Sequence, residues 1–100
     1  MDAAIEISAR HLFPNLSLDQ ILAELLLERA QKNLIKYQII SRQFRAKYEQ
    51  DFATFRQMIL SSEPPFEMEQ DYFDWEAAVT GATDMEKEIK RLESMASSSS

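Results

Sequence analysis

The residues that could do chemistry in this chain are few and lie far apart. His11 is the only histidine, Gly81 is the only glycine, and there is no cysteine. One copy therefore cannot assemble a catalytic triad or a multi-histidine metal site, and glycine-rich phosphate-binding loops are excluded. The lack of cysteine also excludes thiolate nucleophiles, thiolate metal sites and disulfide bonds. We predict that the protein is not an enzyme, uses no cofactor, and carries His11 as a surface or packing residue.

A carboxylate cluster is the remaining candidate for metal chemistry. Glu67, Asp71 and Asp74 are spaced at i, i+4 and i+7, which places them on one face of a helix. Mg²⁺ and Ca²⁺ prefer oxygen ligands, but good sites converge them from a loop or from facing helices. A single helix face directs its side chains outward instead. We therefore expect a solvated or partner-facing acidic surface here, with no bound metal.

The net charge of −6 is distributed in two blocks of opposite sign. Residues 29–47 contain six basic side chains and no acidic one, whereas residues 63–76 contain six acidic side chains and no basic one. Such blocks either attract each other, within the fold or across a dimer, or face partners. Apolar residues occupy much of the basic segment, and the chain is acidic overall. We therefore do not expect direct contact with nucleic acid.

The elements that position these blocks are predicted to be helices. One glycine and three prolines provide few of the turns that a β-sandwich or barrel needs. A capping-box pattern at Ser17 predicts the start of a long helix that can run to about Tyr48. Asp51 is expected to cap a short helix over residues 52–60, after a turn at residues 49–51. Uninterrupted helix through that turn is the alternative.

The second half of the chain predicts a loop and a further helix. The residues before the two adjacent prolines are driven from helical geometry, which predicts a loop over residues 61–65. A third helix should then run from about Phe66 or Glu67 to Thr80. Gly81 can kink it, and a capping-box pattern at Thr83 predicts its continuation to Ser94.

The predicted fold class is all-α, with the long helix, the short helix and the C-terminal helix packed as an antiparallel helical hairpin or bundle. Residues 1–17 form an N-terminal arm, residues 18–95 the helical domain, and residues 96–100 a disordered serine-rich tail. Within the arm, residues 4–8 can form a strand or lead into a short helix at residues 9–13.

The long helix carries apolar residues on two opposite faces. At ~100° per residue, one stripe contains Leu26, Leu34 and Tyr37, and the opposite side contains Leu25 and Ile35. An ordinary surface helix has one apolar stripe, so two stripes predict that a partner or a second copy covers the outer one. The predicted core residues are Leu26, Leu34, Tyr37, Phe44, Tyr48, Phe52, Phe55, Tyr72 and Trp75. The predicted partner-binding residues are Ile21, Leu25, Ile35, Ile39, Glu69, Asp71, Phe73 and Asp74.

Phe73 is the predicted anchor of the acidic surface. Tyr72 and Trp75 share a face that we assign to the core, whereas Phe73 lies ~100° around the helix from Tyr72, toward the acidic side chains. An aromatic ring surrounded by carboxylates is typical of an interface anchor, since aromatic residues carry much of the energy at binding hot spots. Packing of Phe73 on the loop over residues 61–65 is the alternative.

The order of aromatic and charged residues resembles a group of small helical, antitoxin-like proteins of archaea and cyanobacteria that are encoded beside a toxin-like protein. The resemblance covers about residues 29–93, and the usual form has a glycine where this chain has Glu49. It implies that the protein neutralises a cognate toxin by direct binding. The residues that carry the resemblance are Lys36, Tyr37, Phe44, Lys47, Tyr48, Phe52 and Phe55, followed by an acidic stretch that ends in Asp74, Trp75 and Glu76.

The expected function is therefore that of a protein-binding module, an antitoxin-like partner of a cognate toxin. The alternative is a self-associating helical homodimer with a structural or regulatory role and no toxin partner. The N-terminus lacks the pattern of a signal peptide, and no apolar run approaches the roughly 20 residues that span a bilayer. We expect a cytoplasmic, soluble protein with no membrane partner.

Overall fold

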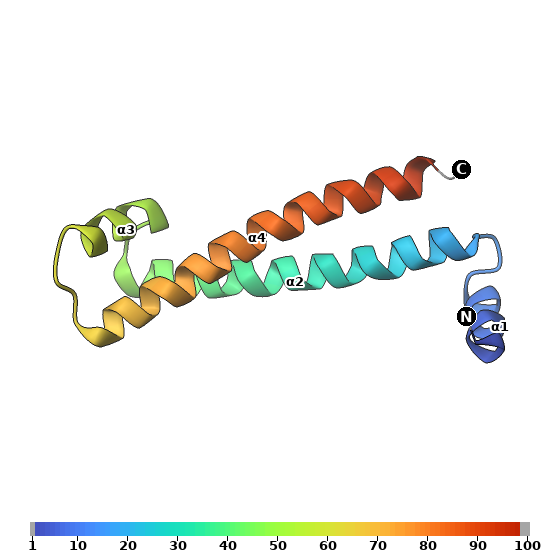
Figure 1. Ribbon diagram of the computed structural model, residues 1–100, viewed down its shortest axis with the longest axis horizontal. Helices are drawn as coiled ribbons and strands as arrows, with labels where there is room; N and C mark the ends of the chain where they lie inside the picture. The colour runs from blue at the N-terminus through green and yellow to red at the C-terminus, as the bar shows by residue number, and fades with distance from the viewer. Residues whose placement is uncertain (1, 99–100) are drawn as a thin grey trace.

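The computed structural model describes residues 2–98 as four helices joined by short connections (Figure 1). They are α1 (Ala3–Leu12), α2 (Leu18–Tyr48), α3 (Phe52–Leu60) and α4 (Phe66–Ser98). The two long helices, α2 and α4, pack side by side and run in opposite directions. Helix α3 covers one end of this hairpin, and α1 lies at the other end. The predicted all-α antiparallel hairpin is confirmed.

The start of α2 follows the capping-box prediction. The Ser17 hydroxyl accepts a hydrogen bond from the Gln20 backbone N–H at 3.1 Å, and the Gln20 side chain accepts one from the Ser17 N–H at 2.8 Å. These two bonds satisfy backbone donors that have no partner within the helix. The predicted N-terminal boundary of α2 is confirmed.

The chain reverses direction directly after α2. Glu49 has a φ of 54° and a left-handed backbone, which ends the helix. Asp51 then caps α3, because its carboxylate accepts a hydrogen bond from the Thr54 backbone N–H at 2.8 Å. The break at residues 49–51 is confirmed, and the alternative of uninterrupted helix is wrong.

The left-handed conformation at Glu49 leads to a prediction. Replacing Glu49 by Gly should raise the free energy of unfolding by about 0.5–1 kcal/mol, because a Cβ atom is unfavourable at positive φ. Urea denaturation followed by circular dichroism measures the change. Glu49→Ala is the matched control, since it removes the charge but keeps the Cβ atom. An equal gain in both variants would show that charge, not backbone strain, is the cause.

Most of the core lies at the end of the hairpin that α3 covers. Phe55, Ile59, Tyr72 and Trp75 form a buried cluster, and partly buried aromatic residues pack against it. The Trp75 indole N–H also donates a hydrogen bond to the Ser41 hydroxyl at 2.9 Å, so its polar atom is satisfied. The core assignments confirmed here are Phe55, Tyr72 and Trp75 as buried residues, and Phe44, Tyr48 and Phe52 as partly buried residues packed against them.

Farther along the hairpin, α2 and α4 approach each other through small residues. Ala30 and Ala78 are buried, and the ring of Tyr37 lies over the backbone of α4 at Gly81. A Cβ atom at Gly81 would stand only 2.6–2.8 Å from three ring atoms of Tyr37. Tyr37 and Leu34 are half-buried. The absence of a side chain at Gly81 therefore allows the close approach of the two helices.

Leu26 departs from the predicted core. Leu26 is 56% exposed, and it lies beside Met85 and Leu92 at the edge of a groove between α2 and α4. The contact positions nearest to it on α2 are the buried residues Ala23 and Ala30. Because these alanines bring the helices close together, the longer side chain of Leu26 is directed to the flank.

Helix α4 is longer than predicted. It runs through Gly81 without a break, and the capping box predicted at Thr83 does not form, because the Thr83 hydroxyl donates to the Val79 carbonyl oxygen at 3.2 Å. The helix extends to Ser98, so residues 96–98 belong to it and not to a tail. Residues 99–100, which we also assigned to the tail, lie outside the described residues.

The N-terminal arm folds as a helix and not as a strand. The Asp2 carboxylate accepts a hydrogen bond from the Ala4 backbone N–H at 2.8 Å and so caps α1. Helix α1 buries none of its residues completely, and its apolar residues Ile5, Ile7 and Leu12 stay largely exposed. It adds little to the core of the hairpin.

Candidate protein-binding surfaces

The predicted partner-binding residues lie on two opposite sides of the hairpin. Leu25, Ile35 and Ile39 are on the face of α2 opposite Ala30 and Tyr37, which face α4. Glu69 and Phe73 are on the face of α4 turned away from α2. We call the first set the α2 outer face and the second set the α4 outer face. The structure does not bring them together into one surface.

The α2 outer face is apolar and accessible in the single chain. Leu25, Ile35 and Ile39 are 44–53% exposed. Glu28 and Lys32 stand between Leu25 and Ile35 on the same face and are exposed as well. No described residue forms an ion pair with either of these charged side chains. Within the part of the chain that the structure describes, no ion pair engages this face and its apolar residues stay half-exposed.

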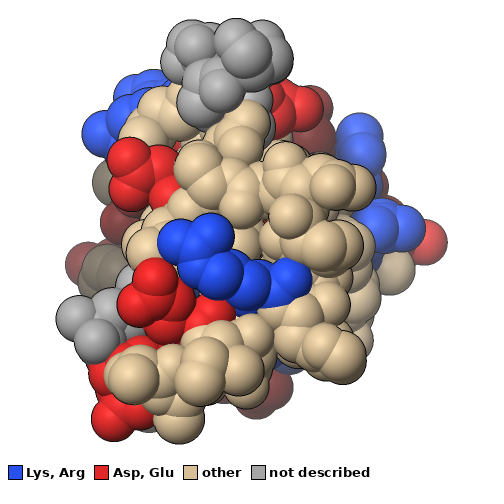
Figure 2. All heavy atoms as spheres, turned by 90° about the vertical axis from the view of Figure 1, so that its right-hand side faces the viewer, with Lys and Arg blue, Asp and Glu red and all other residues tan. Residues whose placement is uncertain are grey.

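Ile21 was predicted to bind a partner, but it is only 3% exposed. It lies at the N-terminal end of the same face, where α1 packs against α2. Figure 2 looks onto this end of the hairpin, where uncharged residues occupy much of the centre beside a basic group with acidic neighbours, and further charged residues lie around the rim. Ile21 is buried within the single chain, so it is not available to a partner.

The α4 outer face combines aromatic rings with carboxylates. Phe73 is 50% exposed, and its ring contacts that of Tyr72 at 5.6 Å between centroids. Glu69 and Asp74 are exposed on either side of it. Phe66, one of the most exposed large apolar residues, lies two helical turns before Phe73 on the same face. The spacing of seven residues could have revealed Phe66, but we had assigned it only to the start of the helix.

Asp71 is engaged inside the fold and is not a partner-binding residue of the α4 outer face. Its Oδ2 atom accepts hydrogen bonds from the Lys47 Nζ at 2.6 Å and from the Tyr48 hydroxyl at 2.5 Å. Lys47 also pairs with Glu67 at 3.4 Å. These contacts join the C-terminal end of α2 to the first turns of α4. They fix the register of the hairpin.

The same contacts shift the pKa values of all three groups. The hydrogen bond to Asp71 raises the pKa of Lys47, and the hydrogen bonds from Lys47 and then Tyr48 lower the pKa of Asp71. Partial burial, followed by the hydrogen bond to Asp71, raises the pKa of Tyr48. The cluster is therefore held with Asp71 negative, Lys47 positive and Tyr48 neutral across the neutral pH range.

This cluster predicts how stability depends on pH. The pKa of Asp71 is lower in the folded chain than its ordinary value of about 3.9. The contribution of ionised Asp71 to the free energy of unfolding is therefore present above about pH 3.9 and is lost as the pH falls further. Asp71→Asn should therefore lose less stability between about pH 5 and pH 2 than the wild type does. Thermal melts across this range measure the effect, with Asp84→Asn, a change at an exposed carboxylate of the same helix, as the control. Parallel acid profiles of wild type and Asp71→Asn would contradict this assignment.

Pairing between the two charge blocks is limited to Lys47. Among the described residues, the other five basic side chains of residues 29–47 form no ion pair with an acidic group. Arg42 and Arg45 line a shallow groove together with Gln38 and Ser41 on one flank of the hairpin. The prediction that opposite charges pair within the fold is thus confirmed at one position, and most of the basic block stays at the surface.

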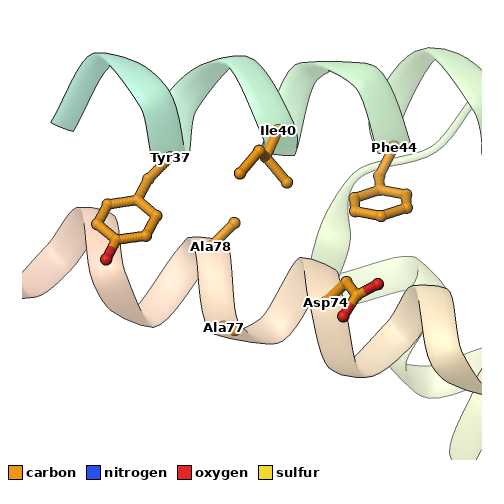
Figure 3. A pocket seen from close by; sticks show the side chains of 6 residues that line it. All are labelled: Tyr37, Ile40, Phe44, Asp74, Ala77 and Ala78. Carbon is orange, nitrogen blue, oxygen red and sulfur yellow. The ribbon is translucent and has the colours of Figure 1, made fainter. Parts of the chain in front are cut away.

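A second groove on the hairpin carries Asp74 at its edge (Figure 3). It has a volume of about 290 Å³ and is lined mainly by apolar side chains. Figure 3 shows Tyr37 at one end, Ile40 and Ala78 between the helices, and the Asp74 carboxylate near the ring of Phe44 at the other end. Its shape and composition suit the aliphatic stem of a lysine or arginine whose charged end reaches Asp74.

The described residues hold neither a cluster of metal ligands nor a helix that could span a bilayer. Between residues 2 and 98, no group of three or more His, Asp or Glu side chains is arranged to hold a metal ion. The carboxylates of the predicted cluster do not converge, since Asp71 faces Lys47 and Asp74 lies at the groove. None of the described helices has both the length and the apolar character of a bilayer-spanning segment.

Comparison of the chain with known proteins found no matching family model, no similar curated protein and no similar solved structure.

Proposed function

We propose that this protein is a cytoplasmic protein-binding module of the antitoxin type, which neutralises a toxin-like protein by covering it and catalyses no reaction. The observation that carries the proposal is the α4 outer face, where Phe73 is half-exposed between the carboxylates of Glu69 and Asp74. Phe66, two helical turns before Phe73 on the same face, is 76% exposed, so the face carries more than one exposed aromatic ring, and contiguous apolar patches rimmed by polar groups mark interaction sites. The face therefore has the features of a binding anchor.

The charge of this face supports a basic partner. The chain carries a net charge of −6, and most of the excess acid lies on α4. An acidic surface attracts a basic protein over a distance and speeds their encounter, and it resembles the phosphates that a nuclease-like toxin would bind. The groove beside Asp74 adds a place for one basic side chain of that partner. Its apolar walls would hold the stem, and the carboxylate would hold the charge.

The resemblance to antitoxin-like proteins gives the proposal its specific form. Those proteins have a glycine where this chain has Glu49, and Glu49 adopts the left-handed conformation that glycine favours. The turn thus keeps the geometry although the residue differs. This agreement supports the resemblance and, through it, the assignment of a toxin-like partner.

Titration calorimetry with the protein encoded by the adjacent gene tests the proposal. We expect binding to the wild type, and we expect Phe73→Ala to raise the dissociation constant at least about tenfold, since truncation of an interface anchor costs more than ~1 kcal/mol. Leu12→Ala is the matched control, because Leu12 is an exposed apolar residue on α1, at the opposite end of the molecule. Equal affinity of the wild type and Phe73→Ala would remove the α4 outer face from the proposal.

A further inference from the structure

The α2 outer face has a regular repeat over residues 18–42. Its residues are separated alternately by three and four positions, which is the spacing of the inner positions of a coiled coil. Apolar residues fill the positions on both sides of two opposite charges in the middle, except that the last position is a basic residue. The positions are Leu18, Ile21, Leu25, Glu28, Lys32, Ile35, Ile39 and Arg42.

This repeat is complementary to its own reverse. If two copies of α2 run in opposite directions around a two-fold axis beside residue 30, positions equally distant from residue 30 face each other. Leu25 then faces Ile35, because each is five residues from the axis. Glu28 faces Lys32, because each is two residues from the axis. Among the accessible positions, each apolar residue from Leu25 to Ile35 therefore meets an apolar one, and Glu28 meets Lys32, whereas at the ends of the repeat Leu18 faces Arg42.

We propose that a second copy of this chain packs antiparallel along the α2 outer face, with the two-fold axis beside residue 30. The occupant is a second copy because α2 itself, running in the opposite direction, supplies a base opposite each central acid. Glu28 and Lys32 are matched in this register and not in the two others that the repeat allows. A parallel pair would place Glu28 against Glu28 and Lys32 against Lys32. An antiparallel pair shifted by one heptad would place Lys32 against Ile35 and Glu28 against Ile39. Both arrangements bring like charges together or bury a charge against an apolar side chain near the centre of the interface, whereas the proposed register does so only at its ends, where Leu18 faces Arg42.

The exposure of the side chains agrees with this arrangement. Leu25, Ile35 and Ile39 are half-exposed in the single chain, and no described residue pairs with Glu28 or Lys32. The two central pairs would give each of these charges a partner. Ile21 is already covered, so Ile39 of the second copy would meet the end of the face where α1 packs.

The dimer goes beyond the proposed function and does not depend on it. The α2 and α4 outer faces lie on opposite sides of the hairpin, so a second copy on α2 leaves Phe73 accessible. One dimer would therefore present two partner-binding faces, directed away from each other. Loss of self-association and loss of partner binding are separate results, measured on separate variants.

Sedimentation equilibrium of the full chain tests the proposal through its charges. The wild type should sediment with twice the chain mass of 11.6 kDa. Glu28→Lys and Lys32→Glu should each weaken the dimer on the order of 100-fold, because each creates two like-charge contacts. An equimolar mixture of the two variants should restore the dimer, because only the mixed pair places Lys opposite Glu at both contacts. If the substitutions acted only through neighbouring charges within the same helix, mixing the two variants would not restore the dimer.

An apolar variant provides the second readout. Ile35→Glu should give a monomer, whereas Gln38→Glu, which adds the same charge on another side of α2, should remain a dimer. Circular dichroism checks that each variant keeps its helical content. A wild type that stays monomeric up to about 1 mM would overturn the proposal and leave the α2 outer face to a different protein. A mixture of the charge variants that stays monomeric would overturn the antiparallel register.

Discussion

Replacing Trp75 by Ala should lower the free energy of unfolding by about 3–5 kcal/mol, which is a large part of the stability of a domain of this size. Trp75 is 1% exposed, and its ring lies 5.2–5.8 Å from the rings of Phe44, Phe52 and Phe55. Phe44 lies in α2, and Phe52 and Phe55 lie in α3, so the ring of Trp75 joins both of these helices to α4. Truncation would leave a cavity that these three rings cannot close without moving apart.

Phe73→Ala is the matched control for this change. Phe73 is an aromatic residue two positions away on the same helix, but it is half-exposed and touches mainly the Tyr72 ring. It should cost less than about 1 kcal/mol, as surface substitutions usually do. Urea denaturation curves of the two variants compare the effects directly. Equal losses at both positions would contradict the assignment of Trp75 to the core and Phe73 to a binding face.

Replacing Gly81 by Leu should have the second-largest effect, a loss of about 1–3 kcal/mol. The cause is the ring of Tyr37, which leaves no room for even a Cβ atom at this position. A leucine would favour the helix intrinsically by nearly 1 kcal/mol over glycine, so the expected loss shows that packing between α2 and α4 dominates. Thermal melts followed by circular dichroism measure the change.

Tyr37→Ala provides the background that isolates this cause. With the ring removed, Gly81→Leu should cost little or even stabilise the chain, because only the helix preference remains. Thr80→Leu, at an exposed neighbouring position, controls for the added apolar surface and should be close to neutral. If Gly81→Leu is equally destabilising in both backgrounds, the contact between Tyr37 and Gly81 is not its cause.

The parts of the fold that local interactions decide could be predicted from the sequence. Ser17 and Asp51 place the starts of α2 and α3 because each side chain accepts from a backbone N–H a few residues ahead. The reversal at Glu49 follows between them. In contrast, Gly81 looks like a helix breaker when only its neighbours in sequence are considered. Its role depends on Tyr37, 44 positions earlier, so the uninterrupted α4 could not be predicted locally.

The candidate surfaces could be predicted only as sets of residues on a helix face. Ile21 and Leu25 belong to the same apolar stripe, and nothing in the stripe distinguishes them. The fold buries the first, near the end of α2 at which α1 lies, and leaves the second exposed. Likewise, Asp71 and Asp74 belong to one acidic block, but Lys47 and Tyr48 engage only Asp71. In both cases the exposure of the side chain depends on contacts between helices, which the pattern along one helix does not reveal.

The most direct test of protein binding as the function is a calorimetric titration of the adjacent gene's product into this chain. The account predicts a stoichiometric complex with the wild type, affinity that falls as salt is added, and binding weakened at least about tenfold by Phe73→Ala but not by Leu12→Ala. Absence of heat and of any complex at protein concentrations near 0.1 mM, with the chain folded, would contradict the account.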